Sequence, residues 1–283
     1  MSTNQCYVCG SNDMSMQTLK AQSVDHELSL LICNACGHGV RSQPLDAGQT
    51  IAAQIESEVH RNIKPPNPVA DRRFRRPILV LNQVLRTVRE FGDGGRRALD
   101  IGCNNGAWLA LLGDEWDKHG VEVSSEAAMI AEEHTSATII TGMIEDYKAE
   151  LGSFDLITAF ALIEHVTDPR AIVRWVHAHL KPVGVFVLMT GDRESDNAKN
   201  LRDDWHLYWS EDHVSFFSHR SLARLLDDEG FSVVRMEWRF SDPTCQSAPY
   251  RYTQKLKEVL GLINTPVHSN LYCYALPALH KDA

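Results

Sequence analysis

The sequence lacks several features that mark membrane, secreted or fibrous proteins. Its longest apolar runs, such as residues 183–190, fall far short of the roughly 20 residues that a membrane-spanning helix needs. Residues 1–6 contain neither a basic stretch nor an apolar one, so we expect no secretory signal and a cytoplasmic location. No repeat or low-complexity tract interrupts the chain. These absences indicate a compact protein with no membrane insertion.

Positive charge is scarce and unevenly placed. The net charge is −9 over 283 residues, with +3 in residues 1–97 and −12 in residues 98–283. Because phosphate contacts supply most of the affinity for duplex nucleic acid, the acidic C-terminal two thirds is a poor candidate for binding it. Hydrophobic residues make up 43% and charged residues 23%, which is typical of a globular chain of one or two domains.

Cysteine is sparse, but four of the seven cysteines form a pattern. Two Cys-x2-Cys-Gly knuckles are separated by 23 residues. This spacing lets four thiolates face one tetrahedral zinc ion, and the glycine after each knuckle permits a tight turn. Four thiolates leave no open position for substrate, so the zinc is expected to be structural and the nearby His38 a bystander. A redox role for either pair is the weaker interpretation. The predicted ligands are Cys6, Cys9, Cys33 and Cys36.

A proline-rich segment at residues 64–68 separates two parts of the chain. We predict a zinc-ribbon module and linker over residues 1–64, including a strand at 28–32 and a helix at 51–59, and a second domain over residues 65–283. The basic run at 71–76 is either the first turn of a helix ending at 91 or a contact for an anionic ligand or RNA.

Strand-like and helix-like segments alternate from residue 97 onward. This alternation predicts an α/β fold with a doubly wound, seven-stranded, mainly parallel sheet. In such sheets, ligands bind beyond the carboxyl ends of the strands. The expected strands are 98–101, 119–123, 138–141, 155–160, 184–190, 232–238 and 270–275, and the expected helices are 107–112, 125–134, 170–180, 221–229 and 254–262.

A glycine-containing loop follows the first of these strands. Gly102 and Gly106 lack Cβ atoms, and Asn104 tolerates left-handed backbone, so a ligand can approach the chain closely. Glu122 ends the second strand, where a carboxylate can accept hydrogen bonds from ribose hydroxyls. Asp100 stands just before the loop, where it suits a cationic amine better than the pyrophosphate of a dinucleotide. The pattern therefore favours S-adenosylmethionine (SAM) as the cofactor.

Three motifs in the expected order make residues 75–277 resemble the class I SAM-dependent methyltransferases. They lie at 100–106, at 154–169 with its Glu-His pair, and at 180–189. The resemblance implies that Asp100 lies near the methionine amino group, with Gly102 against the cofactor and Glu122 on the ribose. It also implies that Phe160 and Ala161 flank the methionine end.

The chain departs from the family pattern at the turn that holds adenine. Met143 stands where an acidic residue usually accepts the adenine amine. Recognition of adenine then falls to backbone groups of Ile144 or to Glu145. Asn104 also occupies a position that is commonly glycine in the family.

Methyl transfer requires alignment of the reactants and removal of a proton. Glu164 and His165 follow the fourth strand, near the expected position of the reacting methyl group. Histidine titrates near neutral pH and a neighbouring carboxylate can orient it, so we predict His165 as the general base with Glu164 beside it. The alternative is that both residues cap or fix the next helix through hydrogen bonds.

A polar and aromatic cluster at residues 204–218 lies between the fifth strand and the next helix. Aromatic faces mixed with His and acidic groups suit the stacking of sugar rings and the binding of hydroxyls. Phe216 and Phe217 could equally be core residues, with Ser218 as a helix cap. The substrate-side candidates are Trp205, His206, Tyr208 and His213.

A zinc ribbon joined to this fold resembles bacterial methyltransferases that modify sugars and other small molecules. The chain ends soon after its last strand, whereas the relatives that act at carbon carry a long additional C-terminal domain. We therefore predict O-methylation of a saccharide or similar hydroxylated small molecule, by analogy. The alternatives are a nucleotide-sugar C-methyltransferase, an RNA methyltransferase that uses the ribbon for recognition, and a non-catalytic zinc-ribbon binding module.

Overall fold

The computed structural model describes residues 5–22, 24–43, 63–66, 75–144, 152–240 and 268–278. The helices expected at 51–59 and 254–262, most of the basic run at 71–76, and Glu145 lie outside these described residues. The division of the chain into domains at residue 64 stays a prediction. Among the described helices, not one has the length and apolar character needed to cross a membrane.

The main sheet has seven strands in the order β10-β11-β8-β7-β4-β5-β6. The neighbouring strands from β8 to β6 pair in parallel, whereas β11 is antiparallel to both β8 and β10. The predicted seven-stranded, mainly parallel sheet is therefore confirmed. Its strands are β4 (Arg97–Ile101), β5 (Asp117–Glu122), β6 (Thr138–Thr141), β7 (Phe154–Phe160), β8 (Leu180–Gly191), β10 (Phe231–Phe240) and β11 (His268–Pro277).

Side-chain caps set where the main helices begin. Ser124 accepts a hydrogen bond from Ala127 N at the start of α4, and Asp168 accepts one from Ala171 N at the start of α5. Ser218 caps α7, as the sequence indicated. The helix expected at 107–112 is only the short 3-10 turn η2 (Leu109–Leu111). The helices are α3 (Arg75–Phe91), α4 (Ser125–Thr135), α5 (Pro169–His179), α6 (Asp196–Leu201) and α7 (His219–Asp228), with 3-10 turns η5 (Arg202–Asp204) and η6 (His206–Trp209) between α6 and α7.

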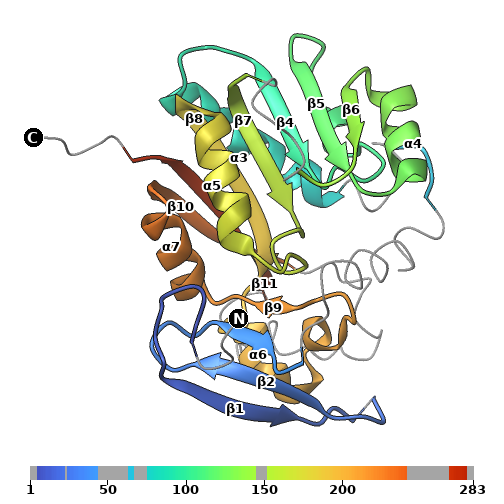
Figure 1. The fold of residues 1–283 in the computed structure, drawn as a ribbon. Helices are drawn as coiled ribbons and strands as arrows, with labels where there is room; N and C mark the ends of the chain where they lie inside the picture. Colours follow the sequence, from blue (N-terminus) through green and yellow to red (C-terminus); the bar gives the residue numbers. More distant parts are fainter. Residues whose placement is uncertain are drawn as a thin grey trace, which may run out of the picture.

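The sheet of the N-terminal module is completed by a strand that lies far away in the sequence. Strands β1 (Met14–Leu19), β2 (Leu28–Cys33) and β3 (Gly39–Arg41) form an antiparallel sheet, and β9 (Ser215–Phe216) adds to its β3 edge. Figure 1 shows this sheet, with β1 and β2 in blue, below the main sheet and next to α6 and β9. The segment between β8 and α7 therefore belongs structurally to both parts.

Apolar side chains of the N-terminal strands need a covering surface, and the β8–α7 segment supplies it. Leu28 and Leu30 alternate with more exposed residues along β2 and point to the same face. That face forms one buried cluster with side chains from the segment 198–216. The main members from that segment are Ala198, Trp205, Tyr208 and Phe216.

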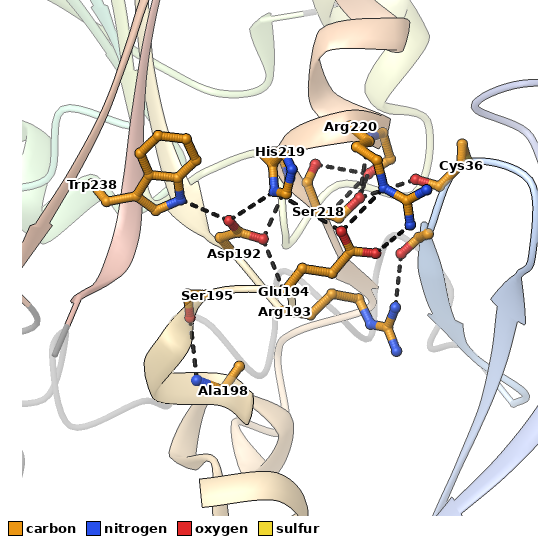
Figure 2. Close-up of polar contacts among 12 residues, drawn as sticks. Cys36, Asp192, Arg193, Glu194, Ser195, Ala198, Ser218, His219, Arg220 and Trp238 are labelled. Carbon is orange, nitrogen blue, oxygen red and sulfur yellow. Dashed lines mark hydrogen bonds and ion pairs between the residues drawn. The ribbon is translucent and has the colours of Figure 1, made fainter. Parts of the chain in front are cut away.

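Polar contacts also join the two parts beside the second cysteine knuckle (Figure 2). The Ser218 hydroxyl donates to the carbonyl of Cys36 at 3.0 Å, and Arg193 Nη1 donates to the carbonyl of Gly37 at 2.9 Å. Because Ser218 also caps α7, the knuckle contacts the first turn of that helix directly.

Asp192, at the end of β8, collects donors from three separate segments (Figure 2). Its carboxylate accepts hydrogen bonds from the Glu194 amide at 2.9 Å, from His219 Nδ1 at 3.2 Å and from Trp238 Nε1 at 2.7 Å. The residue is only 1% exposed, so these donors satisfy a buried charge. Asp192 thereby fixes the exit of β8 against α7 and β10.

Phe217 lies in a core that both parts share. Its side chain is fully buried, and its ring packs against His38 of the N-terminal module at a centroid distance of 4.7 Å. The same cluster contains Cys6 and Cys33 together with residues of the main sheet. The two parts should therefore unfold together.

Replacement of Phe217 by Ala is expected to lower the free energy of unfolding by about 3–5 kcal/mol, because it removes a buried ring from the shared core. Urea denaturation followed by fluorescence and by far-UV circular dichroism should give one coincident transition in both the variant and the parent. The control Phe91→Ala, at a position 36% exposed, should stay within about 0.5 kcal/mol. Two separate transitions in the parent protein would contradict a shared core.

Candidate active site

The two cysteine knuckles converge as the spacing predicts. The Sγ atoms of Cys6 and Cys36 lie 3.7 Å apart and those of Cys9 and Cys33 lie 3.5 Å apart. Sulfur atoms bound to one tetrahedral zinc at 2.3 Å are about 3.8 Å apart, so these two separations are close to those of a zinc site. The following Gly37 has a φ of 77°, a left-handed turn that glycine adopts without strain. These four residues could hold a structural zinc.

His38 lies next to the knuckle but outside the group of four thiols. Its ring is fully buried, packed between Tyr7 and Phe217, and burial lowers its pKa to about 3. Neither ring nitrogen has a hydrogen-bond partner among the described residues. His38 is therefore a neutral core residue, as the interpretation of it as a bystander requires.

The loop after β4 adopts the close-approach conformation expected for cofactor binding. Gly102, Asn104 and Gly106 have φ values of 74°, 48° and 77°, all in the left-handed region. A Cβ atom at Gly106 would lie 2.5 Å from Thr135 Cγ2, so α4 packs too closely for any larger residue. The loop therefore presents backbone rather than side chains at the carboxyl end of β4.

Asp100 is a buried carboxylate at that same end of β4. It is 4% exposed and accepts a hydrogen bond from Thr158 Oγ1 on the neighbouring β7 at 2.6 Å. Burial raises the pKa of Asp100 to about 7, and the hydrogen bond from Thr158 opposes this shift. A cationic amine beside it would stabilise the ionised form, which is the chemistry that the sequence predicts here.

Glu122 organises the cofactor loop from the end of β5. One carboxylate oxygen accepts from the amide of Asn104 at 2.8 Å and the other from the amide of Ser124 at 2.9 Å. A carboxylate oxygen can accept more than one hydrogen bond, so its contacts with these amides are compatible with binding of ribose hydroxyls. The structure thus brings Asp100, Gly102, Asn104, Gly106 and Glu122 together at adjacent strand ends.

Other predicted cofactor residues flank this loop. Ile144 is buried and Met143 half-buried after β6, whereas Glu145 lies outside the described residues. Phe160 ends β7 with its ring edge-on to Trp108 at 5.1 Å, and the exposed Ala161 has a φ of 50°. Their contacts with a cofactor remain predictions, but all follow strands that lead into the same edge of the sheet.

Glu164 and His165 meet residues of the β8–α7 segment just beyond β7. His165 Nδ1 lies 3.1 Å from the backbone oxygen of Asp212 and 3.3 Å from its carboxylate. The rings of His165 and His213 pack edge to face with centroids 4.7 Å apart. The backbone oxygen of Glu164 accepts hydrogen bonds from the amides of Val214 and Ser215. We call Glu164, His165, Asp212 and His213 the Glu-His cluster.

The groups of the Glu-His cluster differ in charge. Burial raises the pKa of Glu164. Burial also acts on Asp212, but the adjacent His165 and the hydroxyl of Ser210 outweigh it and hold its pKa below the usual range. His213 donates from Nδ1 to the carbonyl of Leu207 at 2.8 Å, and burial lowers its pKa to about 3. His213 is therefore neutral, while Asp212 is an ionised partner for His165.

The same cluster could hold a divalent cation. One ligand atom each from Glu164, His165 and His213 lies within 4.8 Å of the others, and Glu164 Oε2 is buried with no partner among the described residues. Both histidines use Nδ1 toward a carbonyl, which leaves Nε2 directed elsewhere. The arrangement can serve in proton transfer or in coordination.

The substrate-side candidates separate in the structure. His213 joins the Glu-His cluster and His206 is half-buried on η6. Trp205 and Tyr208, at 1% and 5% exposure, lie instead in the apolar cluster under β1 and β2, because that face of the ribbon needs a partner. The possibility that Phe216 and Phe217 are core residues is confirmed, since they are 3% and 0% exposed.

Sequence reasoning missed two residues of the site. Asp212, inside the cluster at 204–218, contacts His165, and Arg41 binds the chain around it, yet neither was singled out as a site residue. The density of acidic and histidine residues at 211–213 was the available signal for Asp212. The sequence around Arg41 contains no pattern that indicates its role, because its partners lie about 170 residues away. The helix-capping alternative for Glu164 and His165 is not seen, since Asp168 caps α5.

Comparisons with known proteins agree with this geometry. A family model described as "Methyltransferase domain" matches residues 70–236. The ubiquinone biosynthesis O-methyltransferase of Vibrio campbellii is 32% identical over 128 residues, covering 42% of this chain and 54% of that protein. The protein of the same name from Methylococcus capsulatus is 31% identical over 157 residues, covering 50% and 66%. The chain thus spans about half to two thirds of the length of these curated relatives.

A solved structure gives the same fold. Magnesium protoporphyrin IX methyltransferase from Synechocystis with bound SAH aligns with a TM-score of 0.52 and 13% identity, over 82% of this chain and 95% of that one. At this identity the likeness shows a Rossmann-like methyltransferase fold and nothing finer.

Replacement of Cys33 by Ser should remove a metal that the purified protein otherwise holds. We expect about one zinc per chain in the parent and almost none in Cys33→Ser, because three thiolates hold the ion far less tightly than four. Inductively coupled plasma mass spectrometry measures the content. The control Cys273→Ala changes a buried cysteine of the main sheet and should retain the zinc. Equal zinc in both variants would contradict the assignment.

Proposed function

The chain belongs to the methyltransferase domain family, and on that premise we propose that it transfers the methyl group of SAM to an oxygen of a hydroxylated small molecule. The observation that carries this proposal is the position of the Glu-His cluster. It follows β7, whose neighbour β4 leads into the glycine loop. A proton acceptor and a cofactor loop at one edge of the sheet are what methyl transfer to a hydroxyl needs.

The residues at the end of β4 and β5 fit SAM. Bound there, SAM would supply an electrophilic methyl group carried on a sulfonium. Asp100 would pair with the amino group of the cofactor, and Glu122 would accept hydrogen bonds from its ribose while it holds the loop. Met143 and Ile144, with Glu145 after them, would line the adenine side, and Phe160 and Ala161 the methionine side.

His165 is the proposed general base. Its Nδ1 faces the backbone oxygen and carboxylate of Asp212, which fixes the ring orientation and leaves Nε2 to take the proton of the acceptor hydroxyl. The ionised Asp212 stabilises the imidazolium that forms, while neutral His213 adds no competing charge. Glu164, with its raised pKa, borders the same space.

The acceptor is proposed to be a saccharide or a related hydroxylated small molecule. The ribbon joined to this fold supports a saccharide, and the names of the curated relatives support an oxygen acceptor and make a ubiquinone precursor the second candidate. Methyl transfer from labelled SAM to panels of saccharides, ubiquinone precursors and total RNA tests the proposal. Transfer to RNA alone, or at carbon of a nucleotide sugar, would overturn it.

Affinity for SAM should depend on pH through Asp100. The carboxyl has a pKa of about 7, and only its ionised form pairs with the amine, so affinity should fall as pH decreases from 7.5 to 5.5. The decrease approaches about tenfold per pH unit well below the pKa. An α-amino group with a pKa of about 7.7–8.0 is mostly charged at pH 7.5 and becomes more so at lower pH, so its own titration does not weaken binding in this range. Calorimetry should show weaker, pH-independent binding in Asp100→Asn, and an unchanged pH dependence in that variant would refute the role.

Replacement of His165 by Ala should lower kcat by roughly 10²-fold or more, because the acceptor hydroxyl loses its base. The dissociation constant of SAM should not change, since the glycine loop is untouched. The control His134→Ala alters a histidine at the end of α4 and should keep full activity. If His165→Ala retains the parental rate, the residue is structural and the base lies elsewhere.

A further inference from the structure

We propose that the zinc ribbon is a structural part of the acceptor site, and that Arg41 of its strand β3 is the positioning residue for the His165–Asp212 pair. The inference rests on the proposed function, because it assigns the ribbon a task in the same methyl transfer. It differs from a role in recognising a separate macromolecule.

Arg41 holds the chain around Asp212 through three backbone carbonyls. Its Nε donates to the carbonyl of His213 at 2.6 Å, and its Nη2 donates to those of Ser210 at 2.7 Å and Tyr208 at 3.3 Å. The amide of Arg41 donates to Val214 at 3.2 Å. A planar guanidinium can reach acceptors in several directions at once, which the single ammonium of lysine does not reproduce. The guanidinium of Arg41 therefore holds the bend of the chain that carries Asp212 and His213.

The same segment connects the ribbon to the Glu-His cluster through the backbone. In β9, Ser215 lies opposite Val40 and Phe216 opposite Gly39. On the other side, the amides of Val214 and Ser215 donate to the carbonyl of Glu164 at 2.9 and 3.0 Å. A shift of β3 must therefore move the residues that flank His165.

The first knuckle makes a second connection to this segment. The hydroxyls of Tyr7 and Ser215 form a hydrogen bond across the partly buried interface. Arg170, in the first turn of α5, donates to the carbonyls of Tyr7 and Val8. The ribbon thus contacts α5, just after His165, and the segment that binds the carbonyl of Glu164. The glycine loop meets the N-terminal part of the chain elsewhere, through a hydrogen bond from Asn105 Nδ2 to the carbonyl of Lys64, beyond the ribbon strands.

Two consequences separate this role from mere stability. Loss of the Arg41 contacts should impair methyl transfer and leave SAM binding intact, because only the acceptor side depends on the ribbon. It should also loosen the hydrogen bonds from the amides of Val214 and Ser215 to the carbonyl of Glu164, so that these two amides exchange faster with solvent. A displacement of about 1 Å in such a pair costs up to about 10²-fold in rate.

The test uses the full-length protein with Arg41→Lys and the matched control Arg89→Lys. Arg89 is exposed on α3 and donates to the carbonyl of Leu85 in the same helix. In Arg41→Lys we expect kcat to fall roughly 10-fold to 100-fold, with the SAM dissociation constant within about twofold of the parent. The control should match the parent in both measurements.

Hydrogen exchange supplies a readout that does not require activity. The amides of Val214 and Ser215 should exchange faster in Arg41→Lys than in the parent, while amides of β4 and β5 keep their protection. Unchanged exchange at both amides would overturn the proposal, whatever the rate does. If the parent methylates no hydroxyl acceptor, the proposed function fails, yet the exchange result still decides the role of Arg41.

A second measurement covers the case in which Arg41→Lys does not fold. Removal of the metal from the parent by a chelator, with zinc content measured before and after, should accelerate exchange at the same two amides and leave SAM binding unchanged. Loss of zinc without faster exchange there would equally overturn the proposal.

Discussion

The pairing of β3 with β9 is the interaction on which the arrangement of the site depends. Two residue pairs connect the edge of a small N-terminal sheet to a segment that also donates two amides to the carbonyl of Glu164. Neither part could satisfy these buried backbone groups alone, and each unsatisfied group would cost free energy comparable to a lost hydrogen bond. The proposed acceptor side therefore lies where the two sheets meet, whereas the predicted cofactor residues Asp100, Gly102 and Glu122 lie at the ends of strands of the main sheet.

Burial divides the carboxylates of the site into different chemical tasks. Asp100 and Glu164 lie where desolvation dominates and raises their pKa values, so each gains from a cationic or proton-donating neighbour. Asp212 is also desolvated, but a histidine and a hydroxyl together outweigh that effect and hold its pKa below the usual range, so it stays ionised. Groups of one residue type thus suit the proposed roles in cofactor binding and in orientation of a base because their surroundings differ.

Features encoded by local sequence could be predicted, and those encoded by distant contacts could not. The glycine loop, Glu122 and the knuckles could be recognised in the sequence because each depends on residues a few positions apart or on the order of the strands. In the sequence, Trp205 and Tyr208 resemble aromatic residues that bind a ligand, but in the structure they pack against the apolar face of β2. The roles of Arg41 and β9 depend on partners about 170 residues away in the sequence. In addition, a strand as short as β9 shows no hydrophobic periodicity that would predict it. Glu145 lies outside the described residues, so its role at the adenine side stays a sequence prediction.

The core shared around Phe217 has a consequence for how such a protein can evolve. Cysteine ligands and main-sheet residues belong to one apolar cluster, and the inner face of the ribbon is covered by residues 198–216. A recombination event that delivered a different N-terminal module would leave that covering surface exposed to water and prone to association. The ribbon and the β8–α7 segment should therefore be inherited as one unit. Substitutions on one side of their interface should be compensated on the other, although the two segments lie far apart in the sequence.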